Sequence, residues 1–136
     1  MVESCPNAWN GHCFKLVNQH LPWAEAEQHC IDNYCGQLAE IRNTSQHDHV
    51  ESIVVYNTDE AVWIGASEIH QQGVFVWASD GAQVTYNLFT PPDPNNWESS
   101  EACALVWMVT EAHAPNRAIF DARCEVPFQF LCQWRM

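Results

Sequence analysis

Oxygen-bearing side chains gather in one stretch of the chain that has no hydrophobic periodicity. Residues 87–101 contain three prolines and three asparagines, and long loops without secondary structure inside compact domains are usually functional. Within this stretch lie Asp93, Asn95 and Glu101. Carboxylate and amide oxygens are the ligands that Ca²⁺ takes, about six to eight at a time. By themselves, however, these residues predict only a turn-rich loop.

The composition excludes several classes of protein. The chain has 136 residues, a length typical of one domain, and 47% of them are hydrophobic, which is too much apolar surface for a disordered chain. No apolar run approaches the roughly 20 residues that span a bilayer. Five Lys and Arg against 17 Asp and Glu give a net charge of -12. A nucleic-acid binder needs a cationic surface that this chain cannot supply.

The seven cysteines indicate disulfides. The chain contains no CxxC pair and no Cys/His spacing of a structural zinc site, so we expect disulfides and therefore a secreted protein. The segment 1–4 lacks the apolar stretch of a signal peptide, and we interpret it as the start of a mature chain with an added methionine. Because the count is odd, one thiol is free or pairs with another chain.

The patterning predicts helices first and strands afterwards. One helix should begin near Pro22, with a buried stripe at Trp23, Ala26 and Cys30, and end at Gly36. A second should begin at Ser45, with Asp48 completing a partial capping box, and end near Asn57. Short apolar or alternating runs predict strands at 62–65, 74–77, 104–109 and 128–131.

Many landmarks, in order along the chain, resemble a C-type lectin-like domain of the long form. The resemblance extends from Cys5 to Cys132. Within the family, the chain is similar to small soluble invertebrate lectins, such as those of molluscs. It implies a single carbohydrate-recognition domain over residues 1–136 with an α+β fold: two helices flanking two small antiparallel sheets, with a long irregular ligand-binding loop. The landmarks are Cys5-Pro6, Trp9, Cys13-Phe14, Trp23-Ala24-Glu25-Ala26, Cys30, Leu38-Ala39-Glu40-Ile41, Trp63-Ile64-Gly65, Trp77, Asp80-Gly81, Cys103, Cys124 and Cys132.

The resemblance also implies a disulfide pairing. The implied pairs are Cys5–Cys13, Cys30–Cys132 and Cys103–Cys124, which leave Cys35 over. Unpaired cysteines are often fully buried. Cys35, however, lies in a polar stretch beside the glycine that ends the first helix. We therefore expect it to be exposed and to form an interchain disulfide in a homodimer.

The resemblance assigns the loop a ligand set. Asp93-Pro94-Asn95 resembles the Glu-Pro-Asn motif with which mannose-type C-type lectins hold both calcium and sugar. Glu101 and Asp121 stand where the family places two further carboxylate ligands. Two departures weaken the set: Asp93 is one methylene shorter than Glu, and Phe120 replaces an asparagine ligand. Either calcium still binds weakly through Asp93, Asn95, Glu101 and Asp121, or a cation such as Arg117 or Arg123 takes its place.

Aromatic and polar side chains near the loop favour a sugar ligand. Trp97 and Phe120 could stack on the C–H face of a hexose, and His113 could hydrogen-bond hydroxyls, although solvated surface is equally consistent for His113. Trp107 is a third candidate for stacking, but its position in the middle of an apolar run favours the core or a half-buried place. His47 and His49 do not share a helix face, so a metal site there is not expected. Asn43-Thr44-Ser45 is a glycosylation sequon.

We therefore expect a secreted lectin that binds mannose-type glycans, with or without calcium, and that takes part in recognition of microbial surfaces and innate immunity. No enzyme motif is present, and neither nucleic-acid binding nor membrane insertion is expected. The alternative is a protein-binding or mineral-binding member of the same fold, since the negative charge suits a calcium mineral surface.

Overall fold

The computed structural model describes residues 5–58, 60–69, 73–84, 102–107 and 119–136. Within these ranges the chain forms two helices and seven strands, and neither helix is long and apolar enough to cross a membrane. The elements are β1 (His12–Leu21), α1 (Trp23–Tyr34), β2 (Gln37–Leu38), α2 (Thr44–Asn57), β3 (Val62–Ser67), β4 (Val76–Trp77), β5 (Ala102–Val106), β6 (Ile119–Arg123) and β7 (Phe128–Arg135).

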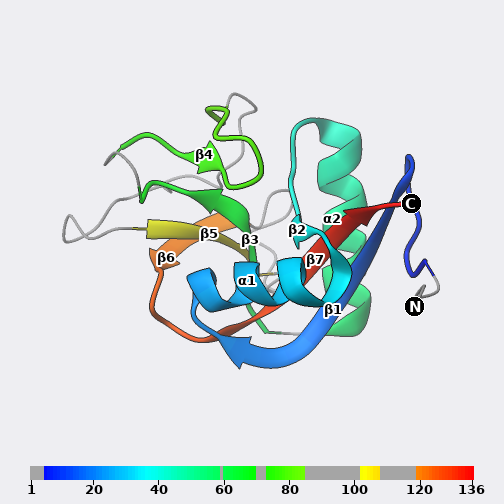
Figure 1. Ribbon diagram of the computed structural model, residues 1–136, viewed down its shortest axis with the longest axis horizontal. Helices are drawn as coiled ribbons and strands as arrows, with labels where there is room; N and C mark the ends of the chain where they lie inside the picture. Colours follow the sequence, from blue (N-terminus) through cyan, green and yellow to red (C-terminus); the bar gives the residue numbers. More distant parts are fainter. Residues whose placement is uncertain (1–4, 59, 70–72, 85–101, 108–118) are drawn as a thin grey trace, which may run out of the picture.

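The strands hydrogen-bond into one mixed sheet, in the order β1-β7-β3-β5-β6, with β2 on β7 and β4 on β3. Pairing of β1 with β7 brings the two ends of the chain together, and His12 lies opposite Arg135 (Figure 1). The expected α+β fold with two helices is confirmed. The two expected sheets, however, are joined, because β3 and β7 pair in parallel at Val62–Gln129 and Trp63–Phe130.

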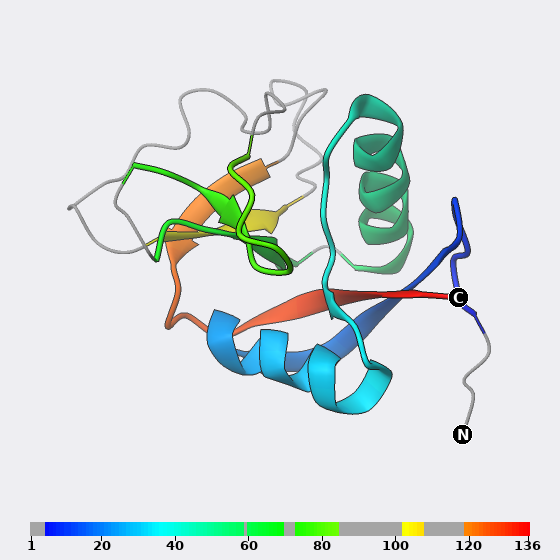
Figure 2. The same ribbon diagram turned by 45° about the horizontal axis from the view of Figure 1, so that its top comes forward.

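The two helices pack on different hydrophobic clusters. Figure 2 shows the β1–β7 ladder between α1 and α2. Successive side chains of a strand point to opposite faces, so Phe130 and Cys132 of β7 join the cluster that contains α1, whereas Leu131 joins the cluster that contains α2. Strand β7 is therefore buried on both faces, and each helix covers one of them.

The first helix agrees with its predicted stripe, since Trp23, Ala26 and Cys30 are its buried residues. Cys35 caps its C-terminus in the left-handed conformation, with a φ of 54°, and the N–H of Gly36 donates to the carbonyl of Cys30 at 3.2 Å. A Cβ on Gly36 would lie 2.2 Å from the main-chain oxygen of Gln133. Glycine is needed here because the chain passes so close to β7.

The second helix begins at Thr44, and its predicted capping residue, Ser45, was wrong by two positions. The N-cap is Asn43, whose side chain accepts a hydrogen bond from the N–H of Gln46 at 2.9 Å. An asparagine at this position satisfies an N–H that the helix leaves without a partner. Ser45 therefore lies inside the first turn and does not cap it.

The predicted order of helices before strands was also wrong. Strand β1 precedes α1, and β2 follows it. Of the ten residues of β1, Cys13, Phe14 and Val17 are buried, so the strand has no regular alternation of apolar and polar residues. It is stabilised by pairing with β7, more than 100 residues away along the chain, which no local pattern can indicate.

The structure contains the three disulfides that the resemblance implies: Cys5–Cys13, Cys30–Cys132 and Cys103–Cys124. The second ties α1 to β7 and closes a loop of 102 residues. Restricting an unfolded chain in this way stabilises the fold by about 4–5 kcal/mol in the chain-entropy model. The third connects β5 to the residue after β6, on either side of residues 108–118.

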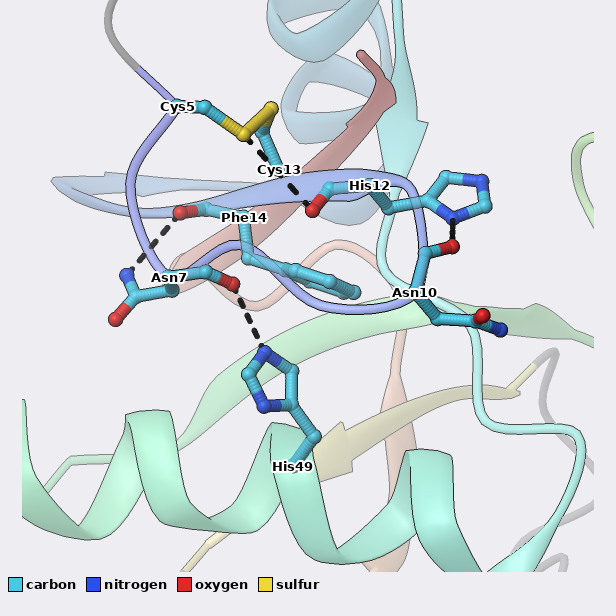
Figure 3. The surroundings of a disulfide bond; sticks show 7 residues. All are labelled: Cys5, Asn7, Asn10, His12, Cys13, Phe14 and His49. Carbon is cyan, nitrogen blue, oxygen red and sulfur yellow. Dashed lines mark hydrogen bonds between the residues drawn. A yellow bond between two sulfur atoms is a disulfide. The ribbon is translucent and has the colours of Figure 1, made fainter.

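Contacts with α2 hold the N-terminal hairpin (Figure 3). The His49 ring hydrogen-bonds to the main-chain oxygen of Asn7 at 3.0 Å and stacks on Trp9 with ring centroids 5.4 Å apart, while the Asn7 side chain donates to the oxygen of Phe14 at 3.1 Å. His47, on another face of α2, is buried and hydrogen-bonds to Glu51 at 2.5 Å. Both histidines therefore hold the fold together.

Candidate functional site

Strand β6 carries the predicted site residues that the structure describes, Phe120 and Asp121. The other predicted sugar and metal ligands lie outside the described residues, as does Arg117: these ligands are Asp93, Asn95, Trp97, Glu101 and His113. Strand β6 is the last in the order of the sheet and pairs with β5 on one side. Residues 108–118 lie between β5 and β6 in the sequence, and the disulfide Cys103–Cys124 flanks them.

Alternation along β6 separates the two predicted residues. Phe120 lies opposite Leu105 of β5, and Asp121 lies opposite Ala104. Phe120 packs against the hydrophobic cluster of Leu105, whereas Ile119 and Ala104 belong to the other cluster. The side chains of Phe120 and Asp121 therefore leave the strand toward opposite faces of the sheet. Phe120 stands where the family has an asparagine ligand, and its ring lies on the face of the sheet away from Asp121.

A groove of about 880 Å³ lies beside Phe120. Its wall contains Trp107 and Phe120, whose ring centroids are 6.4 Å apart in an edge-to-face arrangement. The apolar run around Trp107 favoured a core or half-buried place for this residue over a stacking role, but the side chain is 45% exposed. Strand β5 ends at Val106, which pairs with Ile119 of β6. Trp107 comes directly after this last pair, and its ring reaches the surface. The apolar run that contains it could not show where pairing ends.

The groove also has a polar rim. Asp121 lines it, and so do His20 from the end of β1 and Glu60 from the turn before β3. The His20 ring and the Glu60 carboxylate lie 2.6 Å apart, and both side chains are about half exposed (49% and 50%). Sequence reasoning missed both residues, because they are 40 positions apart and belong to no motif.

Glu68, which follows β3, is a candidate ligand for a cation. Its side chain is 2% exposed. One carboxylate oxygen accepts the N–H of Gly73 at 2.7 Å, and the other is buried with no hydrogen-bond partner among the described residues. Burial raises the pKa of Glu68, the Gly73 hydrogen bond lowers it, and the charge of Asp121 raises it. The buried carboxylate oxygen of Glu68 that has no hydrogen-bond partner among the described residues fits a calcium ion, which takes carboxylate ligands.

The rest of the described chain adds little to a metal site. Within residues 5–58, 60–69, 73–84, 102–107 and 119–136, no group of three or more His, Cys, Asp or Glu is placed to hold a metal ion. Arg123, one of the two arginines considered as a substitute for calcium, forms an ion pair with Glu125. Sequence reasoning also missed Glu68. Its position directly after the strand that begins Val62-Trp63 was the available signal.

Comparison with known proteins identifies the family to which this chain belongs. The family described as "Lectin C-type domain" matches residues 19–134, so the chain belongs to the C-type lectin domain family, which is non-enzymatic and whose members often bind calcium. A protein named "C-type lectin mannose-binding isoform" from Oxyuranus scutellatus is 33% identical over 96% of this chain and 84% of its own length. A protein of the same name from Notechis scutatus scutatus is 34% identical over 95% and 82%.

Solved structures share the fold. Human lithostathine superposes with a TM-score of 0.82 at 22% identity, over 98% of this chain and 92% of that chain. The C-type lectin CEL-I from Cucumaria echinata gives a TM-score of 0.81 at 21% identity, over 96% and 97%. At these identities the likeness concerns the fold alone.

Proposed function

We propose that residues 1–136 form one secreted carbohydrate-recognition domain that binds mannose-type glycans through the 93–101 loop and Asp121. The observation that carries the proposal is the buried carboxylate of Glu68, which has one oxygen without a hydrogen-bond partner among the described residues, in a chain of the C-type lectin family. The charge of Asp121 on β6 acts on this carboxylate. The disulfides, which persist in oxidising compartments, support secretion. The likeness to small invertebrate lectins concerns the source of the chain and stays a prediction.

Calcium is part of the proposal as a weakly held ion. Asp93, Asn95, Glu101 and Asp121 would supply ligands, with Glu68 as a further carboxylate nearby. When bound, the ion would draw the oxygens of the site and of a sugar together. Affinity for calcium follows the number and charge of the ligands. Because Phe120 contributes no oxygen, we expect easy loss of the ion to a chelator.

The preference for mannose-type hydroxyls rests on the loop motif. Asp93-Pro94-Asn95 keeps the order of acid, proline and amide found in Glu-Pro-Asn. The relatives from Oxyuranus scutellatus and Notechis scutatus scutatus carry the name mannose-binding. Galactose-type and N-acetylhexosamine ligands are the alternatives, since a shorter acid at position 93 would re-aim the hydrogen bonds.

The proposal includes a disulfide-linked homodimer. Cys35 is unpaired and exposed at the end of α1, where a second copy could reach it. Two sites on one covalent dimer would bind a glycan-covered surface through effective concentration, although each site alone is weak. This assembly suits recognition of microbial surfaces in innate immunity.

The test is isothermal titration with methyl mannoside, in calcium and in EDTA, on the native chain and on Asp93→Ala and Glu101→Ala. We expect binding in calcium, its loss in EDTA, and at least tenfold weaker binding by both variants. Asp32→Ala, an exposed acid on α1, is the matched control and should bind as the native chain does.

Three results would change the proposal. Binding that survives EDTA but fails in both variants would keep the location and remove calcium. Binding that survives in the variants as well would place the site elsewhere. No binding to any sugar on a glycan array, together with binding to protein or to a calcium mineral, would favour the protein-binding or mineral-binding alternative.

A further inference from the structure

We propose that the groove between Trp107, Phe120 and Phe128 is an extended subsite that holds further sugar rings of a glycan whose terminal residue binds beside Asp121. This inference rests on the proposed function and assigns the groove a ligand class, a neutral oligosaccharide. The groove draws its walls from the end of β1, the turn before β3, β5, β6 and the start of β7.

The aromatic residues provide the apolar part of the subsite. Trp107 is exposed, and Phe120 and Phe128 are half-buried. Phe128 packs edge-to-face against Trp63 with ring centroids 5.0 Å apart, and Phe120 does so against Trp107. These contacts fix the orientation of the rings before a ligand arrives. A sugar ring presents a C–H face that packs on such a surface, and an exposed tryptophan anchor is typical of a binding site.

The polar rim matches the edges of sugar rings. His20 and Glu60 carry hydrogen-bonding side chains beside the aromatic floor, and the 2.6 Å contact between His20 and Glu60 holds both in place. Sugar hydroxyls can donate to a carboxylate and accept from an imidazole N–H. A mixture of flat apolar surface and a few oriented polar groups is the usual lining of a small-molecule site.

Size and continuity indicate more than one sugar ring. Pockets of about 300–1,000 Å³ hold ligands of drug size, and this groove measures about 880 Å³. Asp121 is among the residues that line the groove, and its charge acts on Glu68, so it links the groove with the acidic site.

The experiment compares ligands of increasing length on variants of the groove alone. Isothermal titration would use methyl mannoside, mannobiose and mannotriose with native protein, Trp107→Ala, Trp107→Phe and Glu60→Gln. We expect native affinity to rise with length. Trp107→Ala should weaken mannotriose about tenfold, which corresponds to the loss of one aromatic anchor, and leave methyl mannoside unchanged. Trp107→Phe should recover part of the loss, and Glu60→Gln should act in the same direction as Trp107→Ala.

The controls separate this inference from the proposed function. Tyr56→Ala removes a ring that is 85% exposed on α2 and should change no affinity, and circular dichroism would show that each variant is folded. If native protein binds all three ligands equally, or if Trp107→Ala binds mannotriose normally, the subsite is wrong while the primary site stands. If native protein binds none of these ligands or any other glycan, both proposals are overturned.

Discussion

The charge of Asp121 on β6 reaches the buried carboxyl of Glu68 after β3, two residues 53 positions apart in the sequence. Burial is the main reason that the pKa of Glu68 is raised, and Asp121 adds to it against the opposing hydrogen bond from Gly73. Two carboxylates so arranged repel each other in the absence of a cation. The fold therefore carries an electrostatic cost at this place that a bound calcium ion would relieve.

We predict that Glu68→Gln stabilises the protein at neutral pH when calcium is absent. A raised pKa means that the contribution of Glu68 to stability is fully present below its unfolded pKa of about 4.3 and is lost as pH rises through the folded pKa. Glutamine keeps an oxygen for the N–H of Gly73 and carries no charge. Thermal melts in EDTA should show a gain of about 1 kcal/mol at pH 7, or roughly 3–5 °C, that disappears below about pH 4.

Calcium should reverse the order of thermal stability of the native protein and Glu68→Gln. A ligand that binds the folded state raises its stability, so the native chain should gain Tm on addition of calcium and Glu68→Gln should gain less. Glu25→Gln, an exposed change on α1, serves as the control. Parallel pH profiles for native protein and Glu68→Gln would contradict the electrostatic account.

Cys35→Ser is expected to convert a covalent dimer to a monomer. On non-reducing gels the native chain should run at twice the monomer mass and the variant at the monomer mass. Serine is nearly isosteric with cysteine and would take the same left-handed backbone conformation at position 35. The Tm should therefore change by less than about 2 °C. A native chain that runs as a monomer with one titratable thiol would exclude the dimer.

Gly36→Ala should destabilise the fold strongly. The added Cβ would meet the main-chain oxygen of Gln133 at 2.2 Å and the Cβ of Trp134 at 2.9 Å, so the short β2–β7 ladder must shift. Overpacking of this kind costs about 1–3 kcal/mol, occasionally more, and we expect about 3 kcal/mol in urea unfolding. Gly81→Ala is the control: its φ is +72° but nothing lies within 4 Å of the added Cβ, so about 1 kcal/mol is expected. Equal losses would show that the close approach does not matter.

The sequence by itself determined those features whose physical cause is local or compositional. The buried stripe of α1 follows from residues spaced along one helix face, and seven cysteines without metal-site spacing indicated disulfides. Their pairing came from the resemblance to the lectin family, which also placed Asp121 in the site. Asp93, Asn95, Glu101, Trp97 and His113 stay predictions, since they lie outside the described residues.

Only the tertiary structure decided which distant residues meet. Strand β1 forms because β7 supplies its partners, and the two small sheets join because β3 and β7 run in parallel. Alternation on β6 turned Phe120 away from Asp121, and the end of β5 at Val106 left Trp107 exposed. Register and strand ends are set by pairing between segments far apart in the chain. A local pattern cannot encode them, and for this reason the groove was invisible until the strands were assembled.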